Sequence, residues 1–286
     1  MASLNKIRLT GYVLKNPMIA NLGIEGEEKA IFSIRTIRRD LDSYYGAQFQ
    51  DVMIFYDGME FMNKIKKIVQ FDMVEIKGVF NVLTINKASI CTECGKRNVK
   101  HGGVTSFVYP LAIYKINSLH DAYLHDEHLP ERMLHRFSET SNEAEIIGTV
   151  VSDPEMMMLG KKKNIACCKY RLGIDRKYFI KTQSNLKADY PWVYSYGQHA
   201  ERDYRYLKKG SVVLIDGFVQ KRSVESTMQC EYCGEYYQYK DAASEFVPYS
   251  VEYLQNFLTE EDIIKAEESG EEIKEKEAMK TIFEEI

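Results

Sequence analysis

The sequence contains no apolar run long enough to cross a bilayer, for which a helix needs about 20 apolar residues. Residues 1–6 also lack the apolar centre of a secretory signal peptide. We therefore expect a cytoplasmic protein with no membrane partner. The composition, 45% hydrophobic and 28% charged, is that of a globular protein, and 286 residues suffice for two domains that each bury a core.

Catalytic signatures are also missing. The sequence has no phosphate-binding glycine loop, no serine elbow and no His-Glu-x-x-His motif. Acidic residues are plentiful, but no pair has the spacing of a metal-nuclease or acid–base set. We predict that the protein is not an enzyme.

Cysteine is scarce, yet four of the six cysteines form two Cys-x-x-Cys-Gly units, Cys91 with Cys94 and Cys230 with Cys233. Two thiolates at this spacing hold one edge of a tetrahedral zinc ion, and a closed structural site needs four ligands. We therefore predict one structural Zn²⁺ shared by the four cysteines. The alternatives are separate incomplete sites, the first using His101 and completed across a dimer, and free thiols or a redox pair.

Acidic residues concentrate in the last part of the sequence. Residues 258–286 hold eleven Asp or Glu and four Lys, a net charge of −7, whereas the whole chain carries −4, so residues 1–257 carry +3. A mildly basic body with an acidic tail is a weak pointer to a nucleic-acid partner. The acidic residues at the start of the tail favour a helix there.

The chain repeats itself at an interval of 137 to 139 residues. The repeated positions are Gly11 and Gly148, Pro17 and Pro154, Gly78 and Gly217, Pro110 and Pro248, and the cysteines of the two Cys-x-x-Cys units. Such a long period indicates a duplicated domain rather than a solenoid. The predicted parts are a first domain at 1–117, a linker at 118–141, a second domain at 142–257 and an acidic helix or tail at 258–286.

Each copy shows the same order of alternating segments. Strands are expected near 5–14, 29–37, 50–56, 71–84 and 105–116 with a helix near 59–68, and again near 143–152, 164–174, 190–196, 211–222 and 245–253 with a helix near 198–208. Five strands with a helix between the third and the fourth is the pattern of an OB barrel. The predicted fold is all-β with short helices: two tandem OB barrels, each with a Cys-x-x-Cys loop between strands four and five.

The linker at 118–141 is polar and contains four of the six histidines. We expect a solvated segment with some helix. A metal site from His120, His125 and His128 is the less favoured alternative, because no carboxylate or cysteine is placed to complete its ligand shell.

Two stretches of the second copy, Tyr-Pro-Trp-Val-Tyr-Ser-Tyr-Gly at 190–197 and Tyr-Leu-Lys-Lys-Gly-Ser-Val-Val-Leu-Ile-Asp-Gly-Phe-Val-Gln-Lys-Arg at 206–222, resemble the bacterial-type single-stranded DNA-binding proteins. The resemblance implies a protein that coats and protects single-stranded DNA in replication, recombination or repair. The family's one-barrel subunit usually works as a tetramer, so two chains would supply four barrels and a homodimer is expected. Common family members lack the Cys-x-x-Cys units.

The acidic tails of this family recruit other replication and repair proteins. The resemblance implies the same role for residues 258–286, although the family's glycine-rich spacer and Pro-Phe ending are missing here. A solvated helix packed on the body of the protein is the alternative.

Single strands are bound by aromatic faces on which bases stack and by cations along a groove. The resemblance implies stacking positions at Tyr178, Tyr190 and Tyr196 in the second copy. Trp192 is two residues from Tyr190 and therefore points to the same strand face. The alternative for each ring is a place in the half-buried core.

Basic residues interleave with these rings. In the second copy Lys169 and Arg171 share a strand face, and Arg176 and Lys177 follow them. The candidates in the first copy are Arg35, Arg38, Arg39, Tyr44, Tyr45 and Tyr56. In the first copy, cations occupy the exit of the second strand, where an aromatic residue is expected. The second copy is therefore predicted to be the better binding surface.

Two other functions remain open. A zinc-stabilised OB-fold scaffold would bind proteins, and its aromatic and basic positions would be buried or engaged with protein. An RNA-binding accessory protein would use the same fold, and only a direct comparison of DNA with RNA separates it from the first reading.

Overall fold

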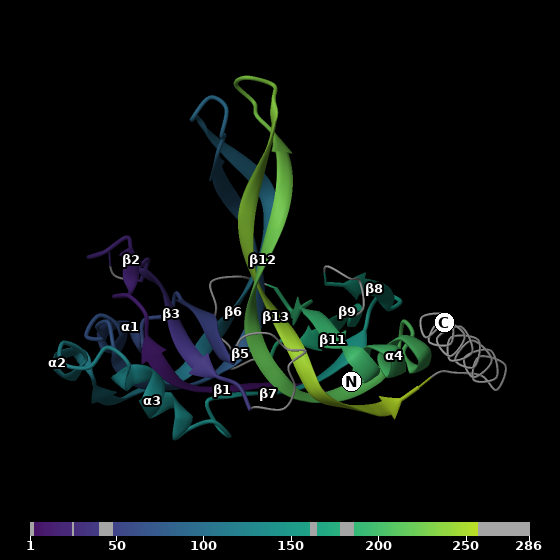
Figure 1. Cartoon of the computed structure of the whole chain (residues 1–286), viewed down its shortest axis with the longest axis horizontal. Coiled ribbons are helices and arrows are strands. Elements are labelled where there is room, and N and C mark those ends of the chain that lie inside the picture. Colours follow the sequence, from purple (N-terminus) through teal and green to yellow (C-terminus); the bar gives the residue numbers. More distant parts are fainter. Residues whose placement is uncertain (1–2, 25, 40–47, 161–164, 178–185, 257–286) are drawn as a thin grey trace, which may run out of the picture.

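The computed structural model of the chain describes residues 3–24, 26–39, 48–160, 165–177 and 186–256 (Figure 1). Strands dominate, and every described helix is short. None of the described helices is long and apolar enough to span a membrane. The predicted all-β class with short helices is confirmed.

The first half of the chain forms a closed ring of five strands. Its elements are β1 (Leu4–Val13), β2 (Met18–Ala20), β3 (Lys29–Ile37), β4 (Phe49–Tyr56), α1 (Met62–Ile65), β5 (Asp72–Ile90) and β6 (Arg97–Ser118). β1 pairs with β3 and β5, β3 with β4, and β5 with β6, all antiparallel, and the parallel pair β4–β6 closes the ring. α1 is shorter than the predicted helix at 59–68, and its Met62 and Ile65, about one turn apart, are buried.

The second half repeats this connectivity. Its elements are β7 (Asn142–Val150), β8 (Glu155–Leu159), β9 (Ile165–Asp175), β10 (Ala188–Asp189), β11 (Trp192–Tyr196), α4 (Gly197–Tyr206), β12 (Val212–Gln229) and β13 (Tyr236–Gln255). The ring runs through β7, β9, β11, β13 and β12 and closes on β7, with β11–β13 as its parallel pair. All ten predicted strands are therefore present, and the short strands β2, β8 and β10 are additional.

Repeated residues make repeated contacts. The Asn5 side chain forms two hydrogen bonds with the backbone of Phe80, at 2.7 and 2.8 Å. Asn142, which begins the second copy, forms the same pair with Val219, at 2.8 and 3.0 Å. The repeat in the sequence is thus a repeat in hydrogen bonding.

Three of the repeated glycines, Gly11, Gly78 and Gly217, lie where the backbone of a neighbouring strand comes close. A Cβ atom on Gly11 would be 2.3 Å from the Arg35 carbonyl oxygen, and one on Gly217 would be 2.1 Å from the Val247 carbonyl oxygen. Any other residue would clash with main chain, which cannot move aside as a flexible side chain can. The glycines therefore permit the tight path of the strands around each ring.

The two rings share one sheet. β1 and β7 pair antiparallel from Leu4 opposite Ile147 to Leu9 opposite Asn142, so the rings lie side by side with these strands between them (Figure 1). Buried apolar side chains of both halves form one continuous cluster. Burial of apolar area is the main favourable term in folding, so the halves stabilise each other.

A buried ion pair forms a second link between the halves. Arg176 and Asp189 of the second half are joined by two hydrogen bonds of 2.6 Å, with side chains only 5% and 1% exposed. Asp189 also accepts a bond of 2.8 Å from the backbone N–H of Val82 in β5, and Arg176 donates to the carbonyl oxygen of Val82. The pair therefore satisfies both polar backbone groups of one residue in the first half.

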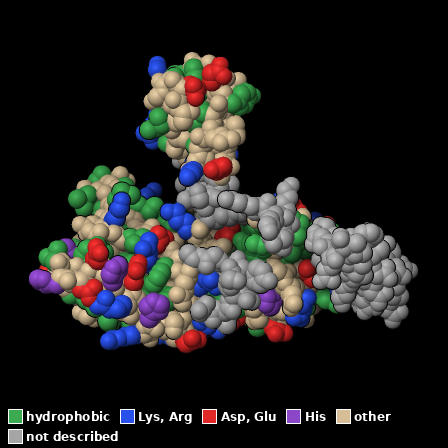
Figure 2. Space-filling model, in the orientation of Figure 1, with side chains coloured by type: hydrophobic (Ala, Val, Ile, Leu, Met, Phe, Trp, Pro, Cys, Tyr) green, Lys and Arg blue, Asp and Glu red, His purple; other side chains and the backbone are tan. Residues whose placement is uncertain are grey.

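The last two strands of each ring continue far beyond it. β5–β6 and β12–β13 are long hairpins that leave the body on the same side and run together, and we call their outer parts, residues 84–104 and 223–243, the stalk (Figures 1 and 2). The sequence predicted strand ends at 84 and 222, and these were too early. No ring core lies against the stalk strands, which contain polar residues such as Lys87 and Ser89, so the apolar alternation fades although the strand pairing continues.

Residues 119–141, which we call the connector, contain α2 (His120–Tyr123) and α3 (Leu129–His135). The expected helical content is present, but the segment is not a solvated spacer. Leu119 and Leu134 are buried in a second apolar cluster with Tyr12, Ile37 and Met73 of the first half. The connector thus packs against the first ring.

Replacing Arg176 with Met should lower the free energy of unfolding by about 3–5 kcal/mol, because it leaves the Asp189 carboxylate buried without its partner. Urea denaturation followed by circular dichroism measures this change. Lys6→Met is the matched control, since it removes an exposed ion pair with Glu145 that also joins the halves, and it should cost less than about 1 kcal/mol. Equal losses in the two variants would contradict the assignment.

Candidate nucleic-acid interface and cysteine cluster

Aromatic and basic side chains lie side by side on the outward face of β9 and β11. Strand pairing places Trp192 opposite Arg171 and Tyr194 opposite Lys169, and all four side chains are half-buried. Tyr190, which is 43% exposed, extends the row next to β11. We call these five residues the β9–β11 face. Alternation along the strands, as expected from the sequence, turns the intervening side chains into the core.

Cations on this face are held against the rings. The Arg171 guanidinium carbon lies 5.3 Å from the centre of the Tyr190 ring and 5.8 Å from that of Trp192, and Lys169 Nζ lies 5.3 Å from the Trp192 ring. Lys169 also pairs with the carboxylate of Glu155, 59% exposed, at 2.7 Å. Two cations and one carboxylate leave the face positive. Such rings and cations can stack on bases and attract phosphates.

A buried carboxylate supports the face from inside the ring. Tyr170, between Lys169 and Arg171 on β9, donates a hydrogen bond of 3.2 Å to Asp203 of α4, and Tyr253 donates one of 2.8 Å. Burial raises the pKa of Asp203 above its usual value, although the hydrogen bonds from neighbouring hydroxyl groups oppose the shift. The carboxyl group therefore ties α4 to β9 and β13 beneath the candidate interface.

Other predicted residues of the second half lie off this face or at its margin. Lys177 is exposed just after β9. Tyr196, at the end of β11, is half-buried and donates a hydrogen bond of 3.2 Å to Glu245. Arg176 forms the buried ion pair with Asp189, so its charge stabilises the contact between the two halves.

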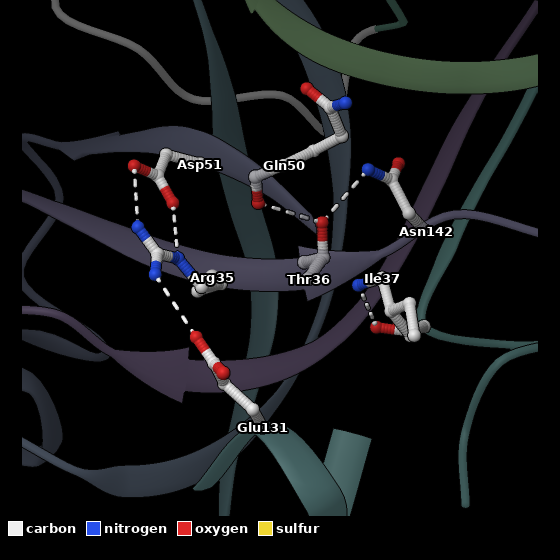
Figure 3. A network of polar contacts seen from close by, with 8 residues as sticks. Arg35, Thr36, Ile37, Gln50, Asp51, Glu131 and Asn142 are labelled. Carbon is white, nitrogen blue, oxygen red and sulfur yellow. Dashed lines mark hydrogen bonds and ion pairs between the residues drawn. The ribbon is translucent and has the colours of Figure 1, made fainter. Parts of the chain in front are cut away.

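Arg35 of the first half is engaged by two carboxylates (Figure 3). Its guanidinium binds Asp51 on β4 at 2.8 Å and Glu131 of α3 at 3.5 Å. Hydrogen bonds to Asp51 hold the pKa of Arg35 above its usual value. With more carboxylates than cations around it, Arg35 is poorly placed to attract a phosphate.

Arg39 of the first half binds residues of the second half. Its guanidinium lies 2.8 and 3.1 Å from the two carboxylate oxygens of Asp216 and is stacked 4.4 Å from the Tyr249 ring centre. Arg38 and Tyr56 are buried, 2% and 3% exposed. These positions thus lie within the protein's own packing. The predicted residues Tyr44, Tyr45 and Tyr178 and the tail at 258–286 lie outside the described residues.

The four cysteines of the Cys-x-x-Cys units meet at the tip of the stalk. Their sulfur atoms all lie within 4.8 Å of one another, although the two pairs are 139 residues apart. The shortest contacts cross between the hairpins, 3.8 Å from Cys91 to Cys233 and 3.6 Å from Cys94 to Cys230. Within the described ranges this is the one group of metal-ligating side chains, so the histidines of the connector do not form a second.

Both tips have the same local structure. Gly95 and Gly234 have positive φ angles of 70° and 77°, and their N–H groups bond the carbonyl oxygens of Cys91 and Cys230, both at 3.0 Å. Burial alone would raise the pKa of the Cys230 thiol, but hydrogen bonds from backbone N–H groups and from Asn98 lower it to about 6. Each hairpin therefore presents two sulfur atoms from a turn that only glycine closes without strain.

One known protein family matches the second half of the chain, which carries the β9–β11 face. Residues 141–232 match the single-strand binding protein family. The predicted resemblance is thereby confirmed over this stretch. The match includes all five residues of the β9–β11 face and does not extend to the first half.

Curated relatives match a stretch of similar length. The chain is 28% identical over 85 residues to single-stranded DNA-binding protein 2 of Clostridium acetobutylicum, which is 30% of this chain and 62% of the relative. It is 29% identical over 85 residues to single-stranded DNA-binding protein 1 of Staphylococcus aureus, which is 53% of that relative. The chain therefore spans between half and two thirds of the length of these relatives.

Solved structures extend the similarity to nearly the whole chain. The wild-type single-stranded DNA binding protein from Thermus aquaticus aligns with a TM-score of 0.57 over 91% of this chain and 97% of its own, at 11% identity. A deletion mutant of the same protein aligns with a TM-score of 0.56 at 12% identity. At this identity the likeness concerns the fold, and it includes both halves.

Sequence reasoning missed Tyr194. It alternates with Trp192 and Tyr196 along β11 and is paired with Lys169, so the period of two residues was the available signal. The opposite error arose at Arg176, because a sequence shows the charge of an arginine but not whether a carboxylate from elsewhere in the chain meets it.

The raised pKa of Asp203 predicts a pH dependence of stability. Between its ordinary value of 3.8 and the raised folded value, the folded state binds more protons than the unfolded state, so the free energy of unfolding falls as pH rises through this window. Asp203→Asn removes this contribution. The variant should therefore gain stability relative to wild type as the pH is raised from 4 to 7, measured by urea denaturation. A constant difference across this range would contradict the prediction.

Proposed function

We propose that the protein binds single-stranded DNA through the β9–β11 face, without catalysis and largely without sequence preference. The observation that carries the proposal is the alternation of cations and aromatic rings on this face, Lys169 and Arg171 against Tyr190, Trp192 and Tyr194, within the stretch that matches the single-strand binding family. Stacking tolerates any base, because every base has a flat face. Cations add attraction to the phosphates that weakens with salt.

Each ring is proposed to be an OB barrel, so that residues 1–117 and 142–257 are two domains of one chain. The closed order of strands and the helix between the third and fourth main strands support this assignment. Coating and protecting single strands in replication, recombination or repair, in the cytoplasm, is the role that follows. A homodimer with four barrels and recruitment of other proteins by residues 258–286 belong to the same proposal.

Changing Trp192 to Ala should raise the Kd for oligo-dT roughly 5- to 150-fold, since loss of one stacking ring costs about 1–3 kcal/mol. Arg171→Ala should lower the slope of log K against log salt by about one. Fluorescence anisotropy of labelled oligo-dT over a salt series measures both. Tyr204→Ala, an exposed tyrosine on α4 outside the face, is the control and should leave the Kd unchanged.

Parallel titrations with duplex DNA and with oligo-rU of equal length identify which type of nucleic acid the protein prefers. Binding to duplex as strong as to single strands, or no binding at low salt, would remove the proposed function and leave the protein-interaction scaffold. Tighter binding to oligo-rU than to oligo-dT would instead favour the RNA-binding alternative.

We further propose that Cys91, Cys94, Cys230 and Cys233 share one structural Zn²⁺. Four sulfur atoms about 2.3 Å from a tetrahedral zinc ion lie about 3.8 Å from each other, and the contacts of 3.6 and 3.8 Å between hairpins agree with this arrangement. The cysteines are free of disulfides, and His101 is not a member of the cluster. A closed site of four thiolates suits a structural role that joins the hairpin tips.

Purified protein should contain one zinc ion per chain by atomic emission, and Cys230→Ser should lose it. Loss of the metal should lower the melting temperature because bound metal contributes to folding free energy. Cys167→Ala changes a buried cysteine of β9 outside the cluster and should retain the metal. A zinc content unaffected by Cys230→Ser would show that the metal is bound elsewhere.

A further inference from the structure

The first half contains a face equivalent to the β9–β11 face. The parallel pairs Ile54–Val108 and Val193–Phe246 occupy the same place in the two rings and align β4 with β11. With this alignment, Met53 and Phe55 of β4 stand where Trp192 and Tyr194 stand in β11. Their partners on β3, opposite Met53 and Phe55, are Ser33 and Ile31, which stand where Arg171 and Lys169 stand in β9.

The chemistry of the two faces differs at each of these positions. Serine and isoleucine replace the two cations, and methionine and phenylalanine replace tryptophan and tyrosine. The next outward pair on this face is Arg35 with Asp51, and Glu131 adds a second carboxylate (Figure 3). Two carboxylates around one guanidinium leave that end of the face negative, which repels a phosphate backbone.

The connector covers the same end of the first-half face. Glu131 of α3 reaches Arg35, and the His135 ring packs edge-on against Phe49 at 5.7 Å between ring centres. Leu134 is fully buried against Ile37 and its neighbours, and other connector side chains pack around this cluster: Leu129, Met133 and Phe137. Ile37, Phe49 and Arg35 are outward residues of β3 and β4, so the helix occupies sheet surface that a strand of nucleic acid would need.

The connector is tied down at both ends. Its first residue, Leu119, donates a backbone hydrogen bond to Phe71 at 3.1 Å. Its last residue, Ser141, is fully buried, accepts a bond of 3.0 Å from the Ile37 N–H through its hydroxyl, and donates to the Thr10 carbonyl oxygen. A segment anchored in this way and packed through a buried cluster is part of the folded body.

We propose that the connector permanently covers one end of the first half's outer sheet face and that the rest of this face lacks the cations needed to hold a strand, so that each chain offers one strand-binding face, the β9–β11 face. The first half then acts as the support that completes the sheet, the core and the stalk. This inference rests on the proposed binding of single-stranded DNA. It predicts one bound strand per chain where a pair of equal barrels would bind two.

Stoichiometry tests the inference directly. Labelled oligo-dT of about 10 nucleotides, a length within the range of one OB fold, is titrated with the full chain at concentrations well above the Kd. Trp192 is the only tryptophan, so its fluorescence reports on the second half alone. We expect anisotropy and tryptophan quenching to saturate together at one strand per chain. Saturation at two strands per chain would overturn the inference, whereas no binding at low salt would remove the proposed function itself.

Matched charge reversals give a second readout. Ser33 and Arg171 hold equivalent positions, and both side chains are half-buried. Arg171→Glu should raise the Kd for oligo-dT at least 10-fold, while Ser33→Glu should change it less than 2-fold. Unchanged thermal unfolding of both variants verifies that they fold. An equal loss of affinity from Ser33→Glu would show that the strand also lies on the first half.

Discussion

The antiparallel pairing of β1 with β7 is the contact on which the rest of the architecture depends. In the first ring alone, the part of β1 that precedes its pairing with β3 would have one side unpaired, and pairing with β7 satisfies these backbone groups and continues one sheet through both halves. The pairing also brings the apolar interiors into one cluster and sends both hairpins off the same side of the body (Figure 1). The cysteine cluster is a consequence of this, because sulfur atoms 139 residues apart in the chain meet only if the hairpins run together.

Charged residues serve two distinct purposes in this molecule. Arg35, Arg39 and Arg176 are bound by carboxylates from other elements, and they hold strands, the connector and the two halves together. Lys169 and Arg171 instead lie against aromatic rings at the surface, where their charge can still act on a ligand. Two rings of the same connectivity thus differ in their outer faces: the first carries the connector, and the second carries the cations of the candidate interface.

Much of the fold could be predicted from the sequence, because its signals are local. Alternation located all ten main strands, and the repeated glycines marked tight strand crossings such as the one at Gly11. The lengths of the stalk strands were missed, since their stability comes from pairing and from the meeting of two hairpins rather than from an apolar face. On the candidate site, alternation placed Lys169 with Arg171 on one strand face and Trp192 with Tyr190 on another, but it could not reveal that Asp189 would bind Arg176.

The sequence by itself therefore determined the all-β class, the duplication, the cysteine pairs and the stretch that matches the single-strand binding family. Each of these features depends on residues that lie near one another in the sequence or recur at a constant interval. Only the tertiary structure decided which cations remain at the surface, that the four cysteines form one cluster, and that the connector lies over the first half's face. These features depend on contacts between residues tens to more than a hundred positions apart. Such contacts arise from how the two rings pack, and no local pattern records them.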